Sequence, residues 1–280
     1  MTATRVLVVM AAILFAGPAQ AYNILTIDMG AYWNRLDWQN WGAQQGRGQA
    51  GQTGERWYTM VHYSDLQQIN LMDYDVLLVQ SGFLDDDVTE PATGALQALQ
   101  AKKAEIASFV AAGHGLVGMA QPLAAPGATP WDWAPVHLES LGGIHENDVR
   151  VPNPGQHPVM ANSTSESLSN WHSSLHGYFT DWDPSLTPLA VQGEHPNSAQ
   201  QLVRATTLAG TYVGDCGRMV YSMQDADYHS YQGIAGAETF MRDAVDWAAG
   251  GVCEPVPEPT SVALLGLGLA AIGVARRRRG

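Results

Sequence analysis

The chain contains few cysteines and few basic residues. Its 280 residues include two cysteines, Cys216 and Cys253, and 14 Lys or Arg against 27 Asp or Glu. Two cysteines exclude a multi-cysteine zinc framework and a disulfide-dense mini-fold. Five of the basic residues lie at the two ends, so only 9 accompany the 27 acidic residues between them. Because a nucleic-acid surface needs clustered Lys and Arg, we expect no nucleic-acid partner.

The composition is nevertheless that of a folded protein. Hydrophobic residues make up 46% of the chain and charged residues 15%. This gives enough apolar surface to offset the entropy that ordering the chain costs, which a disordered sequence lacks.

The first 21 residues have the three parts of a secretory signal. Arg5 is followed by an apolar run at residues 6–16, by Gly17-Pro18, and by the small residues of Ala19-Gln20-Ala21. This order predicts a signal peptide at residues 1–21, removed by signal peptidase so that the mature chain begins at Tyr22. The alternatives are a buried helix or a retained membrane anchor.

The C-terminal end has a second ordered pattern. A linker at residues 253–261 contains Pro257-Glu258-Pro259, and an uncharged apolar stretch follows at residues 262–275. Four arginines then end residues 262–280: Arg276, Arg277, Arg278 and Arg279. A 14-residue helix is about 21 Å long, short of a hydrocarbon core of about 30 Å. The arginines predict a cytoplasmic C-terminus, with the main domain outside the inner membrane.

Together, Pro257-Glu258-Pro259, the Gly-rich apolar stretch and the arginines resemble the PEP-CTERM sorting signal. The resemblance implies that an exosortase, a membrane transpeptidase, cuts the tail near the tripeptide. The helix is then a transient anchor, and the protein ends in the periplasm, at the cell surface or outside the cell. It also implies a cell that makes extracellular polysaccharide. The alternative is a plain single-span anchor.

Between these ends, residues 22–252 alternate strand and helix patterns, which predicts an α/β sandwich with a mainly parallel sheet. Helices are expected at residues 90–112 and 234–249. A polar surface loop is expected at residues 42–54. Later hairpin-like strands are expected to extend one edge of the sheet. The expected strands are residues 23–27, 57–63, 74–80, 116–120, 186–191, 201–205 and 218–222.

Several segments of this region resemble the class I glutamine amidotransferase-like fold, particularly its trehalose-utilisation-like branch. They are residues 74–79, 109–119, His157-Pro158-Val159 and 217–221, with sequences YDVLLV, FVAAGHGLVGM, HPV and GRMVY. The resemblance implies a flavodoxin-like fold.

The same resemblance argues against amidotransferase activity. In that family a nucleophilic cysteine follows the strand after the long helix, on a strained turn. Here the corresponding residues are Gly118-Met119-Ala120-Gln121, none of which is a nucleophile. We therefore assign no catalytic residue.

A ligand is expected at the carboxyl ends of the parallel strands, where α/β folds keep their sites. The candidate ligand-binding residues near these ends are Asp28, Gly30, Ser81, Gly82, Gln121 and His229. The leading interpretation is a non-catalytic module that binds carbohydrate. The alternative is a sugar-active hydrolase or isomerase that uses Asp28 or another carboxylate with a histidine.

Tryptophan is abundant, with nine residues, most of them outside the apolar strands. Rings next to Asp, Asn and Gln suit sugar recognition, although they also close cores under long loops. The nine histidines show no metal-binding spacing beyond His172 and His176, and Asp85-Asp86-Asp87 suits a helix start better than Ca²⁺. We predict no metal and no cofactor.

The two cysteines are expected to form a disulfide. An exported chain meets an oxidising compartment, where an even cysteine count favours pairing. A bridge from Cys216 to Cys253 would tie the end of the domain to its sheet and stabilise it by about 2–4 kcal/mol.

Overall fold

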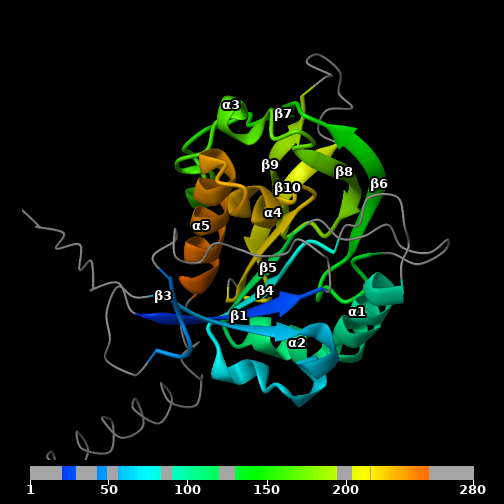
Figure 1. The fold of residues 1–280 in the computed structure, drawn as a ribbon, viewed down its shortest axis with the longest axis vertical. Coiled ribbons are helices and arrows are strands. Elements are labelled where there is room, and N and C mark those ends of the chain that lie inside the picture. Colours follow the sequence, from blue (N-terminus) through cyan, green and yellow to red (C-terminus); the bar gives the residue numbers. More distant parts are fainter. Residues whose placement is uncertain are drawn as a thin grey trace, which may run out of the picture.

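A computed structural model describes residues 21–29, 43–48, 56–82, 90–119, 130–193, 204–214 and 216–251. Its centre is one 11-stranded sheet (Figure 1). Six neighbouring strands, in the order β2-β3-β1-β4-β5-β11, pair in parallel. They are β1 (Tyr22–Asp28), β2 (Ala43–Gln45), β3 (Arg56–His62), β4 (Val76–Val79), β5 (Gly115–Gly118) and β11 (Arg218–Ser222).

The order of the parallel strands identifies the topology. Without the short edge strand β2, the order along the sheet is second, first, third, fourth, fifth in the chain. That order is the flavodoxin-like one, with its switch point between the first and third strands, here β1 and β4. The predicted α/β fold with a parallel sheet is confirmed for this half of the sheet.

The other half is antiparallel, and it continues the sheet from β11 through β10 and β8 to β6. β9 pairs with β10, and β7 pairs with β9. This half extends the parallel strands on one side, as expected of the later strands. The strands are β6 (Leu138–Glu146), β7 (Val149–Arg150), β8 (Leu175–Trp182), β9 (Leu186–Gln192) and β10 (Ala205–Thr211).

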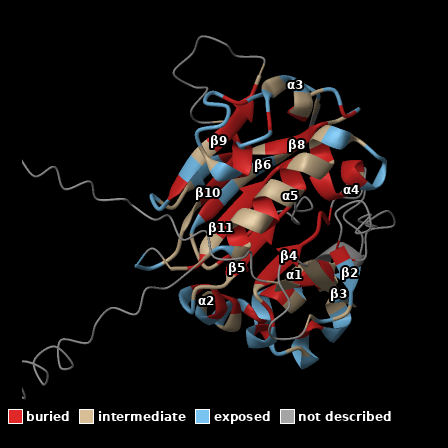
Figure 2. Cartoon of the chain, turned by 90° about the vertical axis from the view of Figure 1, so that its left-hand side faces the viewer, coloured by how far each residue is buried: buried red, intermediate tan, exposed pale blue. Residues whose placement is uncertain are grey.

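Helices cover both faces of the parallel strands (Figure 1). Because side chains alternate along a strand, Val76 and Leu78 pack with α5, whereas Leu77 and Val79 pack with α1 and α2. The central strands are therefore buried on both sides (Figure 2). The helices are α1 (Glu90–Ala101), α2 (Lys103–Ala111), α3 (Ser165–Leu168), α4 (Ala226–Tyr231) and α5 (Ala235–Ala249). Three 3₁₀ helices lie at Tyr63–Gln68, Leu71–Asp73 and Pro158–Met160.

The long helix expected at residues 90–112 is broken at Lys102. Lys102 lies between α1 and α2 and is only 8% exposed, although the sequence places it on the polar side of one helix. Its ammonium group donates to the Ile69 carbonyl at 2.8 Å and pairs with Glu105 at 2.5 Å. The aliphatic stem is thus buried while the charge keeps polar partners. The expected end at Gly113 is confirmed, because Gly113 has φ +102° just after α2.

Other sequence-based boundaries were wrong in the antiparallel half and at one edge. Between residues 121 and 185, where the sequence predicts no helix or strand, the structure contains β6 and β8, and the expected loop at 42–54 contains β2. The strand expected at 201–205 instead begins at Ala205 and runs to Thr211. Gly142 and Gly143 interrupt the apolar alternation of β6, so its sequence LESLGGIHE does not read as a strand.

The two end segments predicted from the sequence lie outside the described residues. These are the signal peptide at residues 1–21, apart from Ala21, and the linker, apolar stretch and arginines of residues 253–280. Among the described residues, none forms a helix with the length and apolar character needed to span a bilayer.

A close approach between β5 and α5 predicts a destabilising substitution. A Cβ added at Gly115 would lie 2.6 Å from the backbone carbonyl of Ala248. Backbone cannot move aside as a flexible side chain can, so Gly115→Ala should lower the free energy of unfolding by about 1–3 kcal/mol in urea denaturation. Gly94→Ala in α1 is the control, because its Cβ meets only the Tyr63 side chain, at 3.1 Å, and helix propensity improves. Equal effects of the two substitutions would contradict this packing.

Candidate functional site

The candidate ligand-binding residues fall into three groups. Asp28 ends β1 and is half-buried, and Ser81 and Gly82 follow β4 and are buried. His229 lies on α4, in the segment that follows β11, and is 3% exposed. Gly30 and Gln121 lie outside the described residues. Asp28, Ser81 and the start of α4 thus lie at the carboxyl ends of parallel strands.

Ser81 is held by a carboxylate from α4. Its backbone N–H donates to Asp227 Oδ2 at 2.8 Å, and its hydroxyl donates to Asp227 Oδ1. Asp227 is 1% exposed. Both donors of Ser81 therefore bond one buried carboxylate, which ties the end of β4 to α4.

A second buried carboxylate, Asp225, lies between two histidines. Its oxygens are 3.0 Å from His176 Nε2 and 3.2 Å from His229 Nε2. Asp225, His176 and His229 are 6, 5 and 3% exposed. His229 Nε2 also lies 3.4 Å from the Ser173 carbonyl oxygen. We call Ser81, Asp225, Asp227, His176 and His229 the carboxylate–histidine cluster.

The cluster joins elements that are far apart in the sequence. Ser81 follows β4 and His176 lies on β8, while Asp225, Asp227 and His229 come from α4 and its start. The backbone N–H of His176 also donates to the backbone carbonyl of Met223 at 2.9 Å. The cluster therefore connects the parallel and antiparallel halves of the sheet.

The two carboxylates have opposite pKa shifts. Burial raises the pKa of Asp227 to about 6, because the hydrogen bonds from Ser81 only partly offset the loss of solvent. Burial also acts to raise the pKa of Asp225, but hydrogen bonds from His176 and His229 hold that pKa at about 2. Burial acts to lower the pKa of His229, and its hydrogen bond with Asp225 raises the pKa instead. In the Asp225–His229 pair, the carboxylate thus favours the protonated imidazole and the imidazole favours the ionised carboxylate.

Three members of the cluster do not appear among the sequence candidates: Asp225, Asp227 and His176. A sequence signal for two of them exists, because Asp225, Asp227 and His229 alternate directly after β11. His176 lies in a region where the sequence predicts no strand, and the spacing of His172 and His176 leaves open whether their segment is helical. His172 is exposed with φ +68°, whereas His176 lies on β8.

The cluster's geometry does not match a nucleophile and its base. A nucleophilic serine needs a base such as histidine at its hydroxyl. The Ser81 hydroxyl donates to a carboxylate instead, and the two histidines bond the other carboxylate. At the end of β5, Met119 is fully buried, where the resemblance places the nucleophile. The arrangement links the end of β4 to α4, and the start of α4 to β8.

Three of the six described tryptophans favour the core interpretation, whereas Trp57, Trp182 and Trp247 are half-buried. Trp131, Trp133 and Trp171 are at most 1% exposed, and Trp131 packs on Trp133, Phe179 and Tyr221. These rings therefore offer no face to a sugar. Trp33, Trp38 and Trp41 lie outside the described residues.

The structure describes one of the two cysteines that are predicted to form a disulfide. Cys216, just before β11, is not a free thiol in the structure. Cys253 lies outside the described residues, so the pairing of the two stays a prediction.

One group of described side chains has the geometry of a metal site, and it lies on β8 and around the start of β6. It consists of His137, Glu139 and Asp181, all exposed. The prediction of no metal stays a prediction. His137 and Glu139 are two residues apart, a spacing that places both side chains on one face of an extended segment.

Comparison with known protein families identifies a sorting motif at the C-terminal end of the chain. Residues 255–279 match the model of the PEP-CTERM protein-sorting motif. The class of the protein follows from this motif: it is an exported protein that exosortase sorts. No curated protein matches the chain in sequence.

Solved structures that are similar to this chain include a ThuA-like protein and a glutamine amidotransferase. A ThuA-like protein from Bacteroides uniformis is 13% identical, with a TM-score of 0.43 over 83% of this chain and 92% of that one. A glutamine amidotransferase from Thermotoga maritima is 8% identical, with a TM-score of 0.49 over 82% of this chain and 99% of that one. With TM-scores below 0.5, neither says anything about the chemistry of this chain.

The raised pKa of Asp227 predicts a pH-dependent contribution to stability. Its pKa is about 6 in the folded protein against 3.8 as a free side chain, so the folded state favours the protonated form. The resulting stabilisation is complete below about pH 4 and is lost as the pH rises through about 6. Relative to Asp227→Asn, the free energy of unfolding of the wild type should fall by on the order of 3 kcal/mol from pH 4 to pH 7.

Urea denaturation of both proteins across this pH range makes the comparison. Glu166→Gln, which alters an exposed carboxylate on α3, is the control and should follow the wild type. Parallel curves for wild type and Asp227→Asn would show that Asp227 does not titrate in this way.

Proposed function

We propose that this exported protein is a binding module of the cell surface or extracellular matrix. Its ligand is extracellular polysaccharide, bound at the carboxyl ends of β1 and β4. The observation that carries the proposal is the position of Asp28 and Ser81 at the ends of these two neighbouring parallel strands. In flavodoxin-like sheets the connections diverge at this point and leave a crevice for a ligand.

The chain that leaves β1 at this point has the composition of a sugar-binding segment. Directly after Asp28, residues 30–42 contain Trp33, Trp38 and Trp41 together with Asn34, Asp37, Gln39 and Asn40. A sugar packs its C–H face on an aromatic ring and bonds its hydroxyls to carboxylates and amides. Since the described buried tryptophans belong to the core, these three are the rings on which the proposal depends.

The carboxylate–histidine cluster supports binding without catalysis. Its four titratable groups are each less than a tenth exposed and bond one another or Ser81. To exchange a proton with a polymer, each of these buried groups would first have to break its contact with its partner in the cluster.

A second candidate function is a sugar-active hydrolase or isomerase that uses a carboxylate and a histidine. The observation that favours it is the pair Asp225 and Asp227, whose pKa values of about 2 and about 6 lie far apart. Such a separation is common between catalytic acids and bases. This function requires turnover of a sugar substrate, which the binding module does not.

The processing steps are part of the proposal. Signal peptidase cuts before Tyr22, exosortase cuts near Pro257-Glu258-Pro259, and residues 262–275 hold the domain at the inner membrane between these events. In support, Tyr22 is the first residue of β1, and its hydroxyl bonds Asp246 of α5, which also pairs with Arg56. A disulfide between Cys216 and Cys253 then secures the domain just before the tail.

A glycan screen of the exported protein tests the binding proposal. The protein recovered from culture medium should bind one or more polysaccharides without changing them. Asp28→Ala removes an acceptor for sugar hydroxyls, and the triple substitution of Trp33, Trp38 and Trp41 by Ala removes aromatic contact area. Each variant should weaken binding at least about tenfold. Glu166→Ala on α3 is the control and should bind like wild type.

The outcomes of that screen separate the two functions. Release of sugar products by wild type, lost in Asp28→Ala or Asp227→Asn, would establish the enzyme instead. Unchanged binding by both Asp28→Ala and the triple tryptophan variant would place any ligand elsewhere.

Substitution of Pro257, Glu258 and Pro259 by Ala tests sorting. The change leaves the apolar stretch and the four arginines intact, so a plain anchor would ignore it. A sorting signal requires the tripeptide, so uncut full-length protein should accumulate in the membrane fraction. Immunoblots of fractionated cells measure this, and equal size and distribution for wild type and variant would contradict sorting at this motif.

A further inference from the structure

The geometry points to a divalent transition-metal site, of the kind that binds Zn²⁺, formed by His137, Glu139 and Asp181. One ligand atom from each residue lies within 4.8 Å of the other two. An imidazole nitrogen with carboxylate oxygens is a donor set that suits zinc and related ions, whereas Mg²⁺ and Ca²⁺ prefer oxygen alone.

The separations fit a metal-centred arrangement. His137 Nε2 is 3.3 Å from Asp181 Oδ2 and 3.8 Å from Glu139 Oε1. Bonds of about 2.1 Å at tetrahedral angles place ligand atoms about 3.4 Å apart. Small side-chain rotations of exposed groups would therefore complete the coordination.

Strand pairing holds Glu139 and Asp181 on rigid backbone, and His137 directly precedes β6. Glu139 of β6 lies directly opposite Asp181 of β8, and the flanking pair is Leu138 with Trp182. The Asp183 N–H donates to the His137 carbonyl at 2.9 Å, which joins the chain just before β6 to the chain just after β8. Since side chains alternate, His137 and Glu139 share the face on which Asp181 lies. A site built on strands is held more tightly than one on loops.

A cation also resolves an electrostatic problem. Like charges directly opposite each other on paired strands destabilise a sheet. Glu139 and Asp181 are such a pair, and the single imidazole of His137 cannot neutralise both. A divalent ion supplies two positive charges at the position between them.

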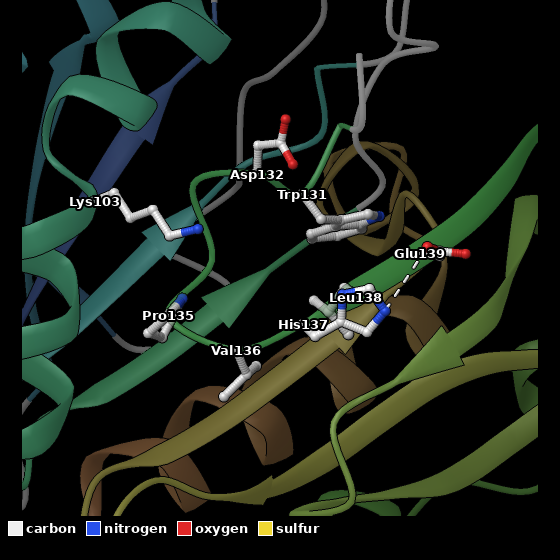
Figure 3. Close-up of a pocket in the computed structure, with 8 residues that line it drawn as sticks. All are labelled: Lys103, Trp131, Asp132, Pro135, Val136, His137, Leu138 and Glu139. Atoms are coloured by element: carbon white, nitrogen blue, oxygen red, sulfur yellow. Dashed lines mark ion pairs between the residues drawn. The ribbon is translucent and has the colours of Figure 1, made fainter. Parts of the chain in front are cut away.

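The site opens onto a cavity. A cavity of about 300 Å³ is lined by His137 and Glu139 together with Lys103, Trp131 and Asp132 (Figure 3). The side chains of His137, Glu139 and Asp181 are 53, 55 and 67% exposed, so water can reach the ion. Three protein ligands leave a fourth position open, which is the arrangement that lets a metal hold water or a ligand oxygen. The ligand class is a small molecule with a hydroxyl or carboxylate oxygen for that position.

Zinc titration of the purified full-length chain in mild detergent, stripped with a chelator and dialysed, tests this site. The wild type should bind Zn²⁺ saturably in isothermal titration calorimetry, and Zn²⁺ should raise its melting temperature because the metal binds the folded state. His137→Asn, Glu139→Gln and Asp181→Asn should each lower the zinc affinity at least about tenfold. An excess of Mg²⁺ should not displace the zinc.

Matched controls alter a histidine and a carboxylate elsewhere. His62→Asn preserves an exposed N-cap at the 3₁₀ helix that begins at Tyr63, and Glu166→Gln changes an exposed carboxylate on α3. Both should bind zinc like wild type. Glu139→Gln and Asp181→Asn also relieve the like-charge pair, so they should fold without metal even if His137→Asn does not.

Two results would overturn the site. One is a wild-type chain that binds no zinc saturably. The other is zinc affinity that is the same in wild type and in the Glu139→Gln and Asp181→Asn variants.

Discussion

Asp225 makes the buried side-chain contacts that link α4 to the antiparallel half of the sheet. It is 6% exposed, and a carboxylate so placed is costly unless hydrogen bonds replace its water. His176 from β8 and His229 from α4 provide these bonds, and Asp227 from the same helix holds Ser81 at the end of β4. The cluster thus adds buried side-chain contacts between the parallel strands, the antiparallel strands and α4 to the backbone pairing of β10 with β11.

The buried carboxylate–histidine cluster differs in solvent exposure from the residues proposed to bind a ligand or a metal. The two buried carboxylates of the cluster have shifted pKa values, and they contact its histidines and Ser81. Asp28, at the edge itself, is only half-buried. The exposed His137 group lies on β8 and around the start of β6, in the antiparallel half. Chemistry with a ligand is therefore expected at the surface, while the buried cluster holds the framework in place.

The sequence predicted the parallel half of the fold better than the rest. Strands such as β4, with four buried apolar residues in a row, and helix ends at Gly113 and Gly250 have strong local signals. β6 and β8 lack such signals, because glycines interrupt one and polar residues the other. At the candidate site, Ser81 and His229 were found from their place after strands. Asp225, Asp227 and His176 act through contacts between distant segments, which no local pattern records.

The central claim is that this domain reaches its final location after being cut at both ends. The most direct measurement is the intact mass of the protein recovered from the culture medium or cell surface, with and without reduction. The account predicts a chain that begins at Tyr22, ends near Pro257-Glu258-Pro259 and gains the mass of two hydrogens on reduction as Cys216 and Cys253 separate. A chain that keeps Met1 or all four terminal arginines would contradict it.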